Sequence, residues 1–232
     1  MGLLKKIAEM LDPKNDSRLH RYYDAWNEYA PSMGLVPLEE LPADIAKIIE
    51  LSEFLSNETH EVHFPCKRQY EDFDFFTFYL IRFFSVVANE DEACNCFVGV
   101  VKFPFKGGEI ILRNQRNKRF KDRGPGLNFE HKDFSDETWV MADPEVLAYQ
   151  FFHPRMIEHF QDFWGYGYQL HAFPGYIIFF QYMPWDMMAY DVLKEPNYEF
   201  KRIKGFNNVA KKFFPEMLEL IPNSLKRGSK DE

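Results

Sequence analysis

The chain has 232 residues, of which 46% are hydrophobic and 28% charged, the proportions of a folded globular protein rather than a disordered one. Its formal net charge of −8 argues against nucleic acid as a partner, because such binding depends on cations that neutralise phosphates. Three cysteines and a start without a signal-peptide pattern indicate a cytoplasmic protein without a disulfide framework. The sequence contains no run of about 18 apolar residues that would span a bilayer.

Aromatic residues are unusually common, with 25 Phe, 12 Tyr and 4 Trp. Each such side chain can bury about 150–250 Å², so they can dominate the energetics of a core. The composition therefore predicts a core filled with phenylalanine. The alternative interpretation is an aromatic-lined groove for a ligand.

Residues 1–58 are expected to form an N-terminal helical segment. A stripe of apolar residues at helical spacing opens it: Leu3, Leu4, Ile7, Met10 and Leu11. Lys5 and Lys6 flank this stripe, as in peripheral membrane anchors. The stripe thus predicts either membrane contact through Leu3, Leu4, Ile7 and Leu11 or packing onto the domain or a partner. Two further helices are predicted, one after an N-cap at Ser17 and one from Pro42.

Residues 59–223 have the sequence pattern of an α+β domain, and residues 224–232 form a polar tail. The stretch Phe73–Ala88 has apolar residues at both odd and even positions, so it predicts a central strand covered on both faces. Further strands are predicted at Cys96–Phe103, Glu109–Leu112 and Glu137–Ala142, and a hairpin at 168–173 and 176–182 around Pro174–Gly175. The pattern predicts a mainly antiparallel sheet with flanking helices.

The helices of this region are marked by prolines. One begins after Asp143–Pro144 and runs to about Phe163 with a break near Pro154, and the closing helix covers Asn207–Leu220 with an interruption near Pro215.

The order of motifs between residues 97 and 163 resembles a known family. The motifs are Phe97-Val98-Gly99-Val100-Val101, Ile110-Ile111-Leu112-Arg113, Leu127-Asn128-Phe129-Glu130, Trp139-Val140-Met141-Ala142-Asp143, and a helix containing Leu147-Ala148-Tyr149 that ends at His153-Pro154. This order is similar to that of the uncharacterised bacterial and archaeal proteins grouped as DUF3137. Many of those proteins carry membrane helices ahead of this region, where the present chain has its helical segment. The resemblance implies a prokaryotic protein and supplies no activity and no catalytic residue.

A possible set of metal ligands is His60, His63, Cys66, Cys94 and Cys96. Zinc requires four such groups in a tetrahedron. Residues three apart in a strand face opposite ways, and Cys-x-Cys is less typical of zinc sites than Cys-x-x-Cys. The spacing predicts no metal, and no motif predicts a cofactor.

Six cations lie close together in the sequence: Arg113, Arg116, Lys118, Arg119, Lys121 and Arg123. A Gly-flanked loop of this kind can bind an anionic partner, and the alternative is a solvated loop that compensates neighbouring acids. Carboxylates at 72–74 and 90–92 are interpreted as turn residues, and His153 and His159 lack the spacing of a zincin.

We therefore expect a binding or scaffold domain, working at a membrane surface or in a protein complex. The alternative is an undescribed enzyme or anion-binding module that uses the basic loop 113–123. A shallow apolar groove would favour the binding domain, and a deep pocket lined by convergent polar groups would favour the alternative.

Overall fold

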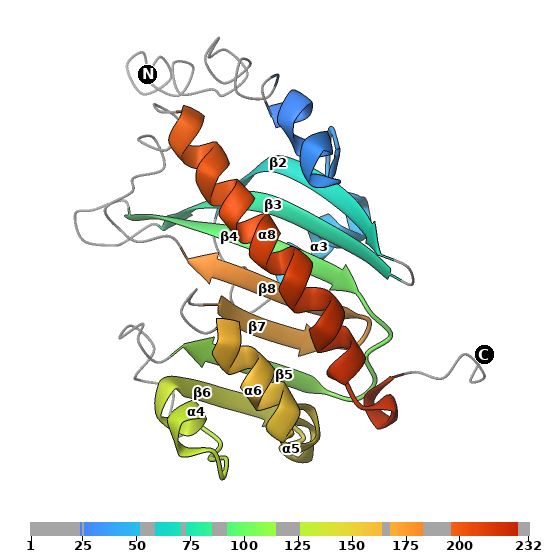
Figure 1. Ribbon diagram of the computed structural model, residues 1–232, viewed down its shortest axis with the longest axis vertical. Coiled ribbons are helices and arrows are strands. Elements are labelled where there is room, and N and C mark those ends of the chain that lie inside the picture. The colour runs from blue at the N-terminus through green and yellow to red at the C-terminus, as the bar shows by residue number, and fades with distance from the viewer. Residues whose placement is uncertain are drawn as a thin grey trace.

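The computed structural model of the chain describes residues 24, 26–51, 59–70, 73–84, 92–114, 126–163, 168–182 and 196–226. Eight strands in this part of the chain form one antiparallel sheet in the order β1-β2-β3-β4-β8-β7-β5-β6, and helices cover both of its faces (Figure 1). The predicted α+β fold, a mainly antiparallel sheet with flanking helices, is confirmed. The strands are β1 (Val36–Pro37), β2 (Thr59–Tyr70), β3 (Phe73–Phe84), β4 (Glu92–Lys102), β5 (Glu109–Asn114), β6 (Thr138–Asp143), β7 (Tyr168–Phe173) and β8 (Tyr176–Tyr182).

Strand β3 shows how the sequence creates two buried faces. Phe75 and Tyr79 point into the core on one side of the sheet, whereas Phe76, Phe78 and Leu80 join a second core on the other side. All five side chains are buried. The prediction of a central strand covered on both faces is confirmed over these residues, while the side chain of Phe84 lies outside the described part.

The first face of the sheet is covered by α8 (Pro196–Leu220), α6 (Pro154–Phe163) and α5 (Val146–Phe151), with α8 crossing the sheet diagonally (Figure 1). Phe213 of α8 lies at the centre of an aromatic cluster. Its ring centroid is 4.8 Å from that of Phe179 on β8, and 5.1 Å and 5.2 Å from those of Phe160 and Phe163 on α6. The phenylalanine-rich composition is thus used to join helices to the sheet.

Helix α8 differs from its prediction because it continues through Pro215 and begins eleven residues earlier, at Pro196 instead of Asn207. A proline inside a helix removes one backbone donor, at a cost of about 3 kcal/mol. Buried Phe214 and Met217 lie on either side of Pro215 and offset that cost by packing. The predicted interruption at this residue is wrong.

Two histidines, one just before α6 and one within it, bond to backbone carbonyls of α8. Nε2 of His153 lies 2.9 Å from the carbonyl oxygen of Leu220, and Nε2 of His159 lies 3.0 Å from that of Phe213. The His159 ring also stacks on the Phe213 ring at 4.7 Å. These contacts tie the two helices together.

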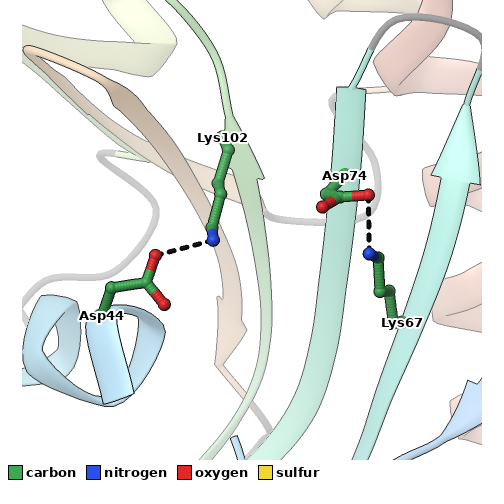
Figure 2. A network of polar contacts seen from close by, with 4 residues as sticks. All are labelled: Asp44, Lys67, Asp74 and Lys102. Carbon is green, nitrogen blue, oxygen red and sulfur yellow. Dashed lines mark ion pairs between the residues drawn. The ribbon is translucent and has the colours of Figure 1, made fainter. Parts of the chain in front are cut away.

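The second face of the sheet carries α3 (Ala43–Leu51), which buries Ile45, Ile48 and Ile49. Figure 2 shows two ion pairs at its rim, Asp44–Lys102 at 2.6 Å and Lys67–Asp74 at 2.9 Å. The hydrogen bond from Lys102 holds the pKa of Asp44 below its ordinary value.

Both ammonium groups of this rim lie over the ring of buried Phe76. Lys67 Nζ is 5.8 Å and Lys102 Nζ 5.4 Å from the ring centroid. Such cation–π contacts add to the apolar packing of α3.

The two strands at the edges of the sheet, β1 and β6, are both short. At one edge β1 has only two residues, one of which is Pro37, and proline lacks the donor that another strand would need. At the other edge β6 is capped, because Leu127 N donates to Val140 O and Thr138 N donates to Phe134 O of α4 (Lys132–Glu137). Within the described residues, β1 pairs with β2 at Cys66 and Lys67.

Part of the predicted helical segment 1–58 belongs to these same cores. Trp26 and Leu35 lie in the first core and α3 in the second, while the stripe Leu3–Leu11 lies outside the described residues. At the other end, Leu225 is buried and Lys226 bridges to Phe105, so packing extends into the predicted tail at 224–232. No helix within the described residues is both long and apolar enough to cross a membrane.

Candidate functional site

Of the six predicted anion-binding cations, the structure describes only Arg113. It lies in strand β5, with 2% of its surface exposed, and not in a loop as predicted. Its guanidinium carbon is 5.3 Å from the centroid of the Trp139 ring on β6. The predicted strand ended at Leu112, whereas Arg113 pairs with Trp139 and lies over its ring inside the sheet. Arg116, Lys118, Arg119, Lys121 and Arg123 lie outside the described residues.

The points where this basic segment leaves and rejoins the described fold are close together. Asn114 ends β5 and pairs with Thr138, and Leu127 donates to Val140 of the same strand β6. Gly126 lies so close to Trp139 that an added Cβ would be 2.9 Å from the indole ring. Residues 115–125 are therefore attached at both ends to the β5–β6 edge.

Four polar residues share the second face of β5 and β7, beyond the area of α3, and we call them the polar cluster: Glu109, Arg113, Gln169 and His171. His171 pairs across the strands with Ile111, so Glu109 and Arg113 are its two diagonal neighbours on β5. Arg113, Gln169 and His171 are all buried.

Within the polar cluster, His171 Nε2 donates to Glu109 Oε1 at 2.5 Å. Burial lowers the pKa of His171, the Glu109 carboxylate opposes this change, and the positive charge of Arg113 adds to it. The imidazole is therefore neutral at neutral pH, with Nε2 as its protonated nitrogen. A histidine oriented by a carboxylate is the arrangement that general bases use.

The lowered pKa of His171 predicts a pH-dependent stability. In the unfolded chain this histidine takes up a proton below about pH 6.5, whereas the folded protein resists that uptake. The free energy of unfolding should therefore fall as the pH decreases below 6.5, by at most about 1.4 kcal/mol per pH unit for one proton. Urea titrations at several pH values give the free energy of unfolding at each pH. This free energy should change less steeply with pH in His171→Gln than in the wild type. Equal slopes in both proteins would contradict the assignment.

The side-chain oxygen of Gln169 is a buried hydrogen-bond acceptor that lacks a donor among the described residues. Its side chain is 1% exposed, and its Oε1 accepts no hydrogen bond within the part of the chain that the structure describes. An unmet buried acceptor costs roughly 1–3 kcal/mol. The polar cluster is thus less well satisfied than the apolar core around it.

Sequence reasoning missed Glu109, Gln169 and His171 as site residues. The available signal was the alternation in β7, where Gln169 and His171 occupy one face and Leu170 and Ala172 the other. Such a period of two predicts one polar face. It does not reveal which strand lies opposite.

A small aromatic hollow lies on the first face, between the sheet, Trp26 and α8. Its volume is about 10 Å³, room for about one water molecule. The lining residues are Trp26, Phe64, Thr77, Phe78, Tyr79, Phe97, Phe206 and Asn207. Phe64 reaches Trp26, at 5.6 Å between centroids, from a bulge in β2 where its φ is +52°. This hollow is mainly apolar and too small for a substrate.

The residues considered as possible metal ligands do not converge where the structure describes them. Cys66 lies in the core of the first face and Cys96 in that of the second. Burial raises the pKa of Cys66 to about 12, although its Sγ accepts a hydrogen bond from Trp26 Nε1. The side chains of His60 and Cys94 are outside the described part. Among the described residues, no group of three or more His, Cys, Asp and Glu side chains is placed to hold a metal.

Comparison with known proteins yields one distant likeness. No family profile matches the chain, and no curated protein matches it. The crystal structure of the mycobacterial trehalose monomycolate transport factor A, TtfA, is similar with a TM-score of 0.48 and 12% sequence identity, over 85% of this chain and 94% of that one. A likeness this distant carries no argument about activity.

Proposed function

We propose that the chain is a non-enzymatic binding or scaffold domain that works at a membrane surface or in a protein complex, and that it contacts an anionic partner through Arg116, Lys118, Arg119, Lys121 and Arg123 of the cation-rich segment 113–123. Arg113 itself is buried in β5 and takes no part in that contact. The attachment of this segment to the β5–β6 edge carries the proposal. Segments that bind partners are commonly positioned by a rigid scaffold of this kind.

The charge of the segment supports an anionic partner. Residues 115–125 contain five Lys or Arg residues and one Asp, in a chain whose net charge is −8. A local excess of one sign attracts and orients ligands of the opposite sign. The rest of the chain carries a net negative charge, which favours contact through this segment.

The test measures sedimentation with phosphatidylcholine vesicles that contain or lack phosphatidylserine, together with pull-downs on an acidic protein and on RNA. Binding should weaken steeply with salt, because screening acts over about 8 Å at physiological ionic strength. Replacing Arg116, Lys118 and Arg119 with Ser should abolish it without changing the thermal midpoint.

The matched control removes three exposed lysines elsewhere, Lys47, Lys106 and Lys211, also to Ser. This change lowers the net charge equally and should leave binding in place. If neither added salt nor the replacement of Arg116, Lys118 and Arg119 weakens binding, the segment is not the site.

The second candidate is an undescribed enzyme, which is favoured by the His171–Glu109 pair at 2.5 Å beside Arg113. Here His171 acts as a general base and the basic segment attracts an anionic substrate. Turnover of phosphate or carboxylate esters that is lost in His171→Gln at unchanged thermal midpoint would favour this candidate. Equal turnover in that variant would exclude His171 as the base.

A further inference from the structure

The elements α4, β6 and α5 lie together at one end of the molecule (Figure 1). Two large apolar side chains of α5 are exposed to solvent there. Val146 is 54% exposed and Tyr149 is 48% exposed. They lie three residues apart in α5 and therefore on one side of that helix. The opposite side of α5 buries Leu147, Ala148 and Phe151, so this exposure is confined to one face.

The exposed strip is held in place by an aromatic chain. The Tyr149 ring lies 5.3 Å from that of Phe129, which in turn lies 5.3 Å from that of Phe134 in α4. Ser135 fixes the same corner, because its Oγ bonds to both the N–H and the carbonyl of Phe129. Phe129 thus links α4 to α5.

Carboxylates outnumber cations in the stretch of chain that carries this strip. Residues 126–152 contain six acidic residues and one lysine. Five of the six are exposed, and none of these five forms an ion pair within the part of the chain that the structure describes. They are Glu130, Asp133, Asp136, Asp143 and Glu145.

We infer that this acidic–apolar patch, formed by Val146, Tyr149 and the five carboxylates, docks a cationic segment of a partner protein that carries an apolar anchor. Interfaces of this kind place an aromatic anchor at the centre and complementary charges at the rim. The patch goes beyond the function proposed above, because its charge is opposite to that of the segment 113–123. Its acidic rim also opposes an anionic lipid surface.

The test uses a fluorescein-labelled amphipathic peptide of leucine and lysine, and a second peptide with serine in place of every leucine. Fluorescence anisotropy should show tighter binding of the leucine peptide, since it alone supplies an anchor. Val146→Ser/Tyr149→Ser should weaken binding about tenfold, as for loss of an aromatic anchor. Asp133→Asn/Asp136→Asn should weaken it about threefold per carboxylate at most and reduce its salt dependence.

Two matched controls separate the patch from the net charge. Val36→Ser/Leu51→Ser removes two side chains that are each 61% exposed elsewhere, and Glu39→Gln/Glu40→Gln removes two exposed carboxylates elsewhere. Both should bind the peptide like the wild type. All four variants change exposed residues, so their thermal midpoints should be unchanged.

Several results would overturn the inference. One is equal weakening in the controls, which would mean that only the net charge matters, and another is equal binding of the serine peptide. If the wild type dimerises and Val146→Ser/Tyr149→Ser is monomeric, the occupant is a second copy. If the peptide binds only after Arg116, Lys118 and Arg119 are replaced by Ser, the occupant is the chain's own basic segment.

Discussion

Phe213→Ala should lower the free energy of unfolding by about 3–5 kcal/mol, the usual cost of removing a buried phenylalanine ring. The ring is 2% exposed and meets side chains from α6, α8 and β8, so a cavity at this position cannot collapse by moving one neighbour. Urea titration at neutral pH measures the effect. Tyr149→Ala removes an exposed ring and should stay within about 0.5 kcal/mol of the wild type.

An unchanged midpoint for Phe213→Ala would mean that α8 does not pack on the sheet as described. If the alanine variant fails to fold, Phe213→Met keeps more of the side chain and should give a smaller, measurable loss at the same site.

Gly108→Ala should destabilise the protein by about 3 kcal/mol or more, the upper end of what overpacking costs. A Cβ at this position would lie 1.6 Å from the carbonyl oxygen of Asp143, so the backbone of β5 or β6 must move. That movement disturbs the first pair of the two strands, Glu109 with Asp143. Thermal and urea unfolding measure the loss.

Two other glycines provide matched controls for this clash. Gly205 lies inside α8 with no atom within 4 Å of an added Cβ, so Gly205→Ala should stabilise the protein by about 0.5–1 kcal/mol. Gly175 has equally open surroundings but a φ of +90°, so Gly175→Ala should cost about 1–2 kcal/mol through backbone strain alone. A loss at Gly108 no larger than at Gly175 would contradict the clash.

The strands that were predicted correctly are those whose position depends on residues within the strand or in the adjoining turn. The hairpin β7–β8 follows from Pro174–Gly175, and the burial of both faces of β3 follows from its apolar residues at both parities. Pairing partners set other boundaries. Strand β4 begins at Glu92, among the carboxylates at 90–92 that were interpreted as turn residues and ahead of the predicted start at Cys96, because Glu92 pairs with Phe84 of β3.

The polar cluster could not be predicted for a related reason. Glu109 and His171 are 62 residues apart, and they meet only because β5 lies next to β7 in the sheet. That strand order follows from packing across the whole domain. The helix α4 was also missed, since its six residues contain charges and a serine, and its formation depends on Phe134 docking beneath Phe129.

The order of strands has a consequence for how the protein folds. Strands β1 to β4 pair with neighbours in sequence, but β4 completes its second edge only with β8, where Val98 meets Phe180 some 80 residues later. Closing so long a loop costs more conformational entropy than forming a hairpin, and it is therefore slower. Until it closes, β4 and β8 expose the unpaired edges of two strongly apolar strands. The join between the two halves of the sheet is therefore where a partly folded chain is most exposed to aggregation.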